Sequence, residues 1–341
     1  MARKGLFQKA ITLPDGKRKF FYGKSRQELN KKLLEYTTEK EKGKKFKAIA
    51  EEWEAVHYSG IEYNTEKRYR CFVGYAVEEF GESRMRDISA DDINIFMTLM
   101  AKNGKTKRTS EGMSSKTLKD QLSVIKMIFK YAKMKKYISE DVSEYLTPPK
   151  GTCAKTREAL TDEEIKKVTE STNCTFGLLA YFLLYTGLRK GEALALRGKD
   201  IDRENKIINV DKAVYFEGNT PHEKGTKTKS GKRQILCPDK LIDLLPEAEP
   251  DDILFGREGR LLKKSEFETG WKHYLRETGL HITAHQLRHT YCTLLYEADI
   301  DVKQAQALMG HSDISITQNI YTHLRENKFK LIADKINSLT R

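Results

Sequence analysis

The chain has 341 residues, long enough for two or three domains, and it carries a net charge of +13. This charge suits a polyanionic partner such as nucleic acid, although an ordinary basic protein has the same balance. The longest apolar stretch, around residues 178–185, is too short to span a bilayer, and no signal peptide opens the chain. Five scattered cysteines without a Cys-x-x-Cys pair exclude a disulfide framework and a zinc site of the usual spacing. We therefore expect a cytoplasmic chain with reduced cysteines, no membrane segment, no metal and no cofactor.

The first forty residues predict a small, separate and basic unit. Two strands, 6–13 and 18–24, flank a Pro-Asp-Gly-Lys turn, and a Ser-x-x-Glu capping box at Ser25 then begins a helix. Eleven basic and four acidic side chains give residues 1–40 a net charge of +7. On one face of the helix we expect Leu29, Leu33 and Leu34.

A charged linker at 39–45 leads into a segment that ends near Leu146 and has helical periodicity. Residues 103–115 are polar and contain two glycines, so we expect a loop between helices there. The apolar residues that recur at helical or near-helical steps are Ile49, Trp53 and Val56, and then Leu118, Leu122, Ile125, Phe129 and Ala132.

Two prolines at 148–149 mark a second boundary, and a capping box at Thr161 begins a third region. In this region an apolar helix over 176–185 ends at Gly187. Strands are predicted at 207–215, 234–237 and 253–255, and helices over 264–340. The last helix has an apolar stripe made of Phe329, Ile332, Ile336 and Leu339.

Two basic clusters precede a single tyrosine near the C-terminus. In chain order the pattern is Arg189-x-x-Glu192, His285-x-x-Arg288, Gly310-His311 and then Tyr321, ten residues beyond the last histidine. Arginine forks can bind both non-bridging oxygens of a phosphate, and imidazoles can bond the phosphate or accept a proton. A tyrosine hydroxyl, with an unperturbed pKa of about 10, attacks poorly without such help. These side chains are the parts needed to break a phosphodiester with a protein nucleophile and no metal.

The ordered set resembles the tyrosine recombinase (phage integrase) family, clearly over residues 155–325 and more loosely upstream. The resemblance implies a multidomain, mainly α fold. Residues 1–42 would be an N-terminal arm-type DNA-binding domain made of a small β-hairpin and a helix. Residues 45–148 would be a helical core-binding (SAM-like) domain. Residues 155–341 would be a mixed α+β, mostly helical catalytic domain whose C-terminal segment packs onto a neighbouring protomer, or else onto its own domain.

The resemblance also implies a role for each residue of the pattern. Arg189 and Arg288 would clamp the scissile phosphate, and His285 would accept the tyrosine proton. His311 would be a second imidazole that hydrogen-bonds the phosphate. Tyr321 would be the nucleophile.

A lysine is expected as the general acid that protonates the leaving 5′-hydroxyl. Lys227, in a Lys-Thr step on the basic connection before the strand at 234–237, matches best, with Lys229 and Lys232 as rivals. Glu192 is expected either to hold Arg189 or His285 in place or to form a plain pair on a helix surface. The residues expected to contact DNA are Lys17, Arg18, Lys19, Lys229, Lys232 and Arg233.

The sequence therefore predicts a site-specific recombinase, an integrase of a phage or conjugative element that acts through a 3′-phosphotyrosyl intermediate. Its expected partners are double-stranded DNA at attachment sites and three further copies in a homotetramer on DNA. An excisionase and a host DNA-bending protein are further candidates. The alternatives are a chromosome-dimer resolvase of the same family, a type IB topoisomerase, and a non-catalytic DNA-binding regulator.

Overall fold

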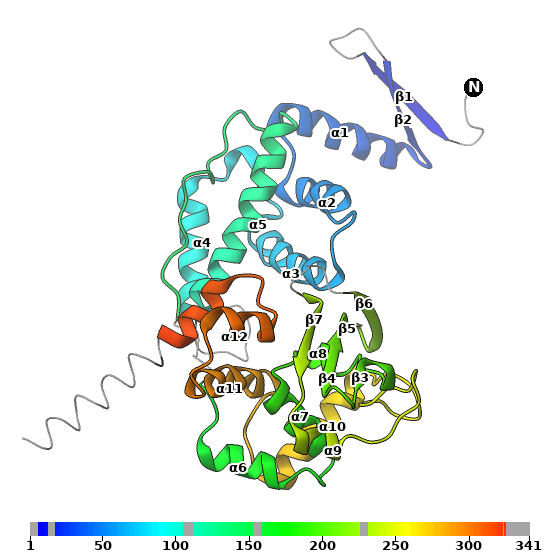
Figure 1. Cartoon of the computed structure of the whole chain (residues 1–341). Helices are drawn as coiled ribbons and strands as arrows, with labels where there is room; N and C mark the ends of the chain where they lie inside the picture. The colour runs from blue at the N-terminus through cyan, green and yellow to red at the C-terminus, as the bar shows by residue number, and fades with distance from the viewer. Residues whose placement is uncertain are drawn as a thin grey trace, which may run out of the picture. The chain divides into compact units, whose positions relative to one another are not determined.

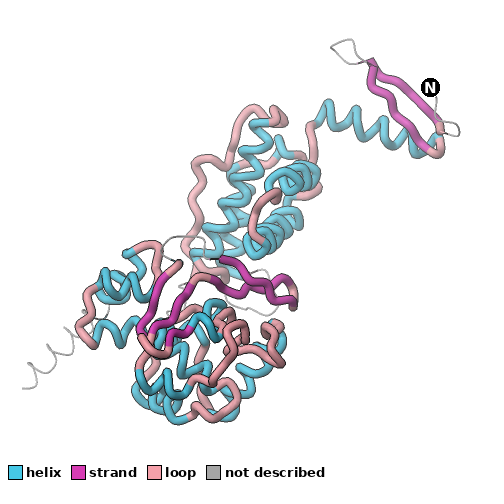
Figure 2. Tube along the Cα trace, turned by 45° about the vertical axis from the view of Figure 1, so that its right-hand side comes forward, coloured by secondary structure: helices cyan, strands magenta, loops and turns pink. Residues whose placement is uncertain are grey.

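The computed structural model describes residues 6–12, 18–104, 112–152, 158–225, 231–322 and 324. The chain separates into two compact units, Met1–Lys155 and Thr156–Arg341 (Figure 1). Within the described residues, strands occur in an N-terminal hairpin and in two small sheets of the second unit, and helices make up most of the rest (Figure 2). The predicted mainly helical fold is therefore confirmed. No helix in the described part of the chain is long and apolar enough to cross a membrane.

An antiparallel hairpin and a helix form the N-terminal part of the first unit. β1 (Phe7–Thr12) pairs with β2 (Arg18–Gly23), and α1 (Arg26–Lys42) packs against both strands. On the face toward the helix, the ring of Phe21 lies 5.0 Å from that of Tyr36. The two strands predicted here are confirmed.

The hairpin covers only part of the apolar surface of α1. Leu29 and Leu33 are buried as predicted, but Leu34 is 68% exposed, so its predicted place on the same buried face is wrong. Two strands can cover only a narrow stripe of a helix, so a residue beside that stripe is exposed to solvent.

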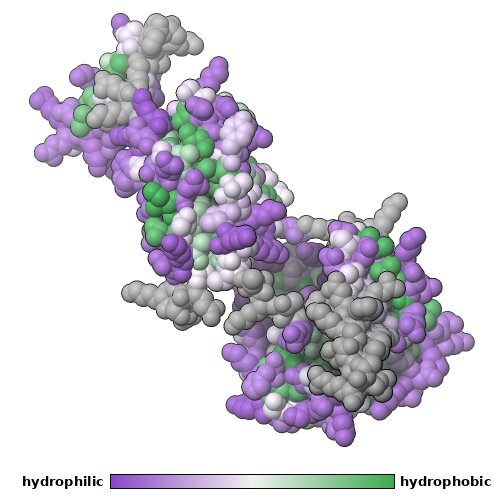
Figure 3. Space-filling model, turned by 90° about the vertical axis from the view of Figure 1, so that its left-hand side faces the viewer, coloured by the Kyte–Doolittle hydropathy of each residue, from purple (hydrophilic) through white to green (hydrophobic). Residues whose placement is uncertain are grey.

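The face of the first unit seen in Figure 3 is mostly hydrophilic, with small hydrophobic patches.

A helical bundle forms the rest of the first unit. It consists of α2 (Phe46–His57), α3 (Tyr63–Phe80), the 3₁₀ turn η1 (Met85–Asp87), α4 (Ala90–Asn103) and α5 (Ser115–Met134). All five residues of the predicted stripe on α5 are buried. Val56, in the last turn of α2, is 63% exposed, so the apolar stripe of that helix ends at Trp53.

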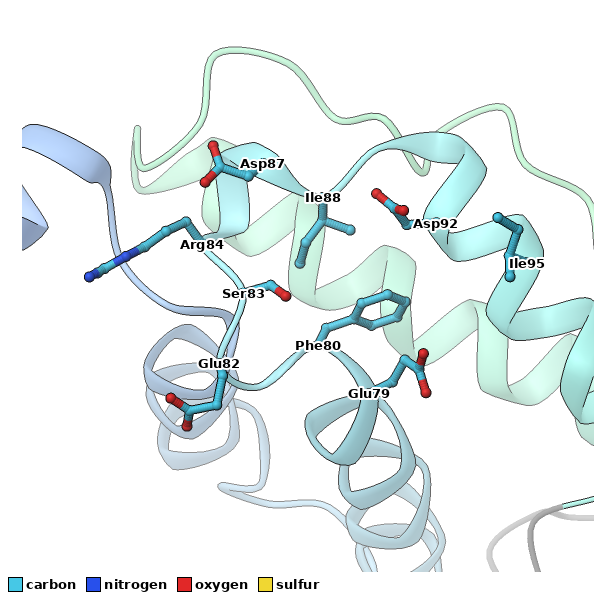
Figure 4. A pocket seen from close by; sticks show the side chains of 9 residues that line it. All are labelled: Glu79, Phe80, Glu82, Ser83, Arg84, Asp87, Ile88, Asp92 and Ile95. Atoms are coloured by element: carbon cyan, nitrogen blue, oxygen red, sulfur yellow. The ribbon is translucent and has the colours of Figure 1, made fainter.

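A surface pocket of about 510 Å³ lies between α3, η1 and α4 (Figure 4). Two of its carboxylates already have partners within the unit. Glu82 pairs with Lys45 at 2.5 Å, and Asp92 forms a capping box with Ser89 at the start of α4. Because carboxylates repel a phosphate backbone, this pocket does not suit a contact with DNA.

The core of the second unit is built around α7, whose residues are almost all buried. The helices are α6 (Asp162–Glu170), α7 (Gly177–Thr186), α8 (Lys190–Ala193), α9 (Asp239–Leu244), α10 (Lys264–Thr278), α11 (Ala284–Glu297) and α12 (Val302–Met309), with a 3₁₀ turn η2 (Gly198–Asp200). Residues 314–322 are also helical. The capping box predicted at Thr161 is present.

Two small sheets lie in the same unit. One has the antiparallel order β3-β4-β7, and the other is the hairpin β5-β6. The bounds are β3 (Ile201–Asp202), β4 (Ile207–Val210), β5 (Lys212–Glu217), β6 (Thr220–Gly225) and β7 (Arg233–Leu236).

The sheets differ from the prediction in two places. The single strand predicted at 207–215 is interrupted at Asp211, because its second half pairs with the unpredicted β6 instead of β7. At 253–255 the structure has only an isolated bridge between Ile253 and Arg197. The apolar stripe predicted at 329–339 lies outside the described residues.

Candidate active site

Arg189 is positioned by the end of α7. Gly187 closes that helix with a left-handed φ of 64°, and Arg189 then precedes α8. Its backbone N–H donates to Glu192 Oε2 at 2.8 Å, and its Nη1 donates to Glu192 Oε1 at 2.8 Å. One carboxylate thus holds both the backbone and the guanidinium of Arg189, whose side chain stays 46% exposed.

Glu192 is a buried carboxylate shared by two arginines. Its side chain is 3% exposed, and Arg233 Nη2 and Nη1 donate to its two oxygens at 2.9 and 3.2 Å. Burial raises the pKa of Glu192, but hydrogen bonds and charges from Arg233, and then from Arg189, outweigh it and lower the pKa. The interpretation of Glu192 as part of a plain surface pair is therefore wrong.

Arg233 also differs from its prediction as a DNA contact. Its side chain is only 6% exposed, and its Nε donates to the carbonyl of Leu308 at 2.9 Å. The residue lies at the start of β7, where the strand packs against α12. Each of its three guanidinium nitrogens thus donates to Glu192 or to Leu308 inside the cluster, an arrangement that does not suit a contact with the DNA backbone.

Three arginines from different elements meet at the C-terminal end of α12. They donate to three successive carbonyls: Arg233 to Leu308, Arg288 to Met309 at 2.6 Å, and Arg189 to Gly310 at 3.0 Å. Carbonyls at a helix C-terminus lack intrahelical partners and carry the negative end of the helix dipole, which attracts cations. Three guanidinium charges against the one carboxylate of Glu192 leave the cluster with a net charge of +2.

Arg288 is buried within this cluster. Its Nη1 donates to the carbonyl of Gly187 at 2.5 Å, which ties α11 to the end of α7. Burial, and then the charge of Arg189, lowers the pKa of Arg288 to about 9, and the charge of Glu192 opposes the shift. The guanidinium therefore stays protonated at neutral pH.

His311 follows the same turn and is buried. Its Nδ1 lies 2.8 Å from the hydroxyl of Thr317, which is also buried. Burial, and then the charges of Arg288 and Arg189, lowers the pKa of His311 to about 4. The imidazole is therefore neutral at pH 7. The sequence pattern did not identify Thr317 as a functional residue, although Thr317 lies between His311 and Tyr321.

His285 lies in the first turn of α11, one turn before Arg288, and its side chain is exposed. After burial and the charges of Arg288, Arg189 and Arg233, an interaction with His285 also lowers the pKa of His311.

Tyr321 lies in helix 314–322 and is held away from the guanidinium groups. Its hydroxyl donates to the carbonyl of Ile300 at 3.2 Å, and its ring meets Tyr296 edge-on at 5.1 Å. Burial raises the pKa of Tyr321 to about 12. In this conformation the hydroxyl is a poor nucleophile.

The expected lysines are only partly described. Lys17, Lys227 and Lys229 lie outside the described residues, and Lys232 is exposed directly before β7. In the N-terminal hairpin, strand alternation places Arg18 and Lys19 on opposite faces. Both residues are exposed, but Lys19 Nζ lies 4.3 Å from the centre of the Tyr36 ring on α1.

The model of the phage integrase family matches residues 154–328, more than half of the chain. The chain therefore belongs to the phage integrase family, and it is a tyrosine recombinase of the site-specific DNA recombinase class. The family resemblance and the enzyme class predicted from the sequence are confirmed.

Relatives and solved structures agree with this assignment. A "Tyrosine recombinase XerC-like" of Caldanaerobacter subterraneus subsp. tengcongensis is 28% identical, over 94% of this chain and 92% of the relative. A "Tyrosine recombinase XerA" of Thermococcus onnurineus is 30% identical, over 84% of this chain and 97% of the relative. The fold is similar to that of the Tn1549 transposon integrase in complex with transposon right end DNA (TM-score 0.66, 20% identity, 85% of this chain and 100% of that chain). It is also similar to that of a lambda integrase dimer bound to a COC′ core site (TM-score 0.60, 17% identity, 94% and 95%).

Proposed function

We propose that this chain cuts and rejoins DNA at attachment sites through a 3′-phosphotyrosyl intermediate and thereby integrates and excises a mobile element. The observation that carries the proposal is the meeting of Arg189, Arg288 and the neutral His311 at one turn. The net positive charge of that cluster suits a phosphodiester, and Tyr321 follows it on the next helix.

In the proposed reaction, Arg189 and Arg288 bind the non-bridging oxygens of the scissile phosphate. The hydroxyl of Tyr321 leaves the Ile300 carbonyl and attacks phosphorus, and its proton passes to His285. The bond between phosphorus and the 5′-oxygen breaks as a hairpin lysine protonates that oxygen. We assign this proton to Lys227, with Lys229 and Lys232 as rivals. His311 donates a hydrogen bond to the phosphate throughout.

We propose a separate role for each of the three predicted regions. Residues 1–42 bind arm-type DNA, residues 45–148 bind the core site, and residues 155–341 carry the chemistry. We propose a homotetramer on double-stranded DNA in the cytoplasm, because a lambda integrase of similar fold is described as a tetramer bound to a Holliday junction. An excisionase and a host DNA-bending protein are the further partners that such an integrase would take.

A chromosome-dimer resolvase is the second candidate, because two relatives of this chain are named XerC-like and XerA. The two functions differ in their DNA sites. Recombination of attachment sites taken from the DNA flanking the gene would support the integrase. Recombination of a chromosomal resolution site, with the flanking sites inert, would support the resolvase.

The nucleophile is tested with a nicked suicide substrate on a denaturing gel. Tyr321→Phe should keep DNA binding and lose the covalent protein–DNA adduct, because only the attacking oxygen is removed. Tyr296→Phe is the matched control, because the two rings pack together, and it should still form the adduct. An adduct that persists in Tyr321→Phe would contradict the assignment.

A further inference from the structure

We infer that Arg233 is a positioning residue, which acts through Glu192 to keep Arg189 available to the scissile phosphate and to hold the turn before His311. The inference rests on the proposed function of the arginine cluster. It replaces the predicted role of Arg233 as a DNA contact.

Arg233 and Arg189 make parallel bridges across the cluster. Each donates to Glu192 and to a carbonyl at the end of α12, Leu308 for Arg233 and Gly310 for Arg189. Their exposures differ: the side chain of Arg233 is 6% exposed and that of Arg189 is 46% exposed. Arg233 therefore occupies the interior bridge, and Arg189 the one that a phosphate can reach.

The charge balance explains why two arginines are needed. A buried carboxylate is costly unless it is paired and hydrogen-bonded. With Arg233 in place, Glu192 has a second cation, so Arg189 does not have to neutralise it alone. Without Arg233, the buried carboxylate would draw Arg189 toward itself, in competition with the phosphate.

Arg233 also packs against the turn that carries His311. A Cβ atom on Gly310 would lie 2.8 Å from Arg233 Nη1 and 2.9 Å from Cζ, and the φ of Gly310 is 63°. The guanidinium thus rests directly on the Cα of Gly310. A glycine is required there by the left-handed backbone and by the closeness of Arg233.

The test uses the full-length protein and single-turnover cleavage of the nicked substrate. Arg233→Gln should slow cleavage roughly tenfold, which is less than the roughly hundredfold cost of removing a donor that contacts the reacting group itself. The affinity for uncleaved DNA and the slope of log affinity against log salt concentration should stay unchanged, because Arg233 neutralises no phosphate. Removal of a residue that neutralises one phosphate would reduce that slope by about 0.9. Gln234→Ala, at the exposed neighbour on β7, is the control and should cleave at more than half the wild-type rate.

A double-mutant cycle with Glu192→Gln identifies the path of the effect. Because Arg233 acts through Glu192, Arg233→Gln should slow cleavage much less in the Glu192→Gln background than in the wild type. If Arg233→Gln does not fold, Arg233→Lys replaces it in the same cycle, because an ammonium cannot bridge Glu192 and the Leu308 carbonyl together.

Equal effects in both backgrounds would overturn the inference, and so would a reduced salt slope or full rescue by a bridging 5′-sulfur substrate. The last result would mean that Arg233 serves only the lysine that protonates the leaving group. Failure of the wild type and of Gln234→Ala to cleave would instead refute the proposed function. Normal cleavage by Arg233→Gln beside an active wild type would refute this inference alone.

Discussion

His311 is a buried imidazole among cations, and this placement makes the stability of the fold depend on pH. Its pKa of about 4 in the folded chain lies below the ordinary value of about 6.5. Between these two pH values, His311 is protonated in the unfolded chain and neutral in the folded chain. Stability therefore falls as the pH falls from about 6.5 toward about 4.

We expect His311→Gln to lose less stability than the wild type over that pH window. Urea unfolding at several pH values between 4 and 7 measures the difference. His281→Gln removes an exposed histidine and should follow the wild-type curve. Parallel curves for His311→Gln and the wild type would show that His311 is not the group responsible.

In the proposed mechanism, the contact with Thr317 sets which nitrogen of His311 carries the proton. For His311 to donate from Nε2 to a phosphate while neutral, Nδ1 must be an acceptor. The hydroxyl of Thr317, 2.8 Å from Nδ1, must then be the donor. The sequence pattern identified the histidine, but it contains nothing that singles out the residue that orients it.

Thr317→Val should slow cleavage roughly tenfold or more, because it removes that donor at nearly constant shape. Thr317→Ser keeps the hydroxyl and should cleave at close to the wild-type rate. ¹⁵N chemical shifts of His311 give a second measurement, with one tautomer in the wild type and Thr317→Ser and a mixture in Thr317→Val. A single, unchanged tautomer in Thr317→Val would contradict this role.

At the scale of elements, the C-terminal end of α12 organises the site. The carbonyls there accept from Arg189, Arg233 and Arg288, which lie directly before α8, in β7 and in α11 and are far apart in the chain. A single glycine, Gly310, both ends the helix and leaves room for Arg233. Gly279 ends α10 with a similar φ of 66°, and a Cβ atom added to Gly279 would have no neighbour within 4 Å.

These two glycines make a matched pair. Gly279→Ala should cost only the left-handed backbone strain, about 1–2 kcal/mol of unfolding free energy. Gly310→Ala should cost more, because it also displaces the guanidinium of Arg233, and it should slow cleavage. Urea unfolding and single-turnover cleavage measure both effects. Equal losses of stability with normal cleavage in both variants would argue against the packing of Arg233 on the turn.

The elements of the second unit were only partly predictable. The capping box at Thr161 and the buried α7 depend on neighbouring residues, so local patterns revealed them. The β5-β6 hairpin was missed although the sequence contains a sign of it, Gly218-Asn219 between the paired residues Glu217 and Thr220. A Gly-Asn pair between two strands is typical of a tight hairpin.

At the scale of the whole molecule, residues 1–42 are the part of the chain proposed to bind arm-type DNA. The exposed face of the hairpin carries Arg18, Phe20 and Tyr22, and residues 1–40 hold a charge of +7. These features suit a second DNA site apart from the cleavage site. The predicted division into three domains stays a prediction, since the chain separates into two compact units.

Deleting residues 1–40 should spare cleavage of a short core site. It should weaken binding to longer attachment DNA. The slope of log affinity against log salt concentration should become shallower by about 0.9 for each phosphate that the protein no longer neutralises. Filter binding across a salt series measures this. Arg18→Ala should reduce the slope more than Lys19→Ala, because Lys19 stacks on Tyr36. Unchanged affinity and slope after the deletion would contradict a DNA-binding role for residues 1–40.

By itself, the sequence determined the family, the order of Arg189, His285, Arg288, His311 and Tyr321, and most helices, because these depend on spacing along the chain. Only the tertiary structure decided how the charges pair. Glu192 needs a buried cation, and several basic residues were available; packing selected Arg233, 41 residues away. Packing likewise brought Arg233 to Leu308 across 75 residues and Arg189 to Gly310 across 121. No local period encodes such pairs, because burial and geometry fix them only when the elements have packed.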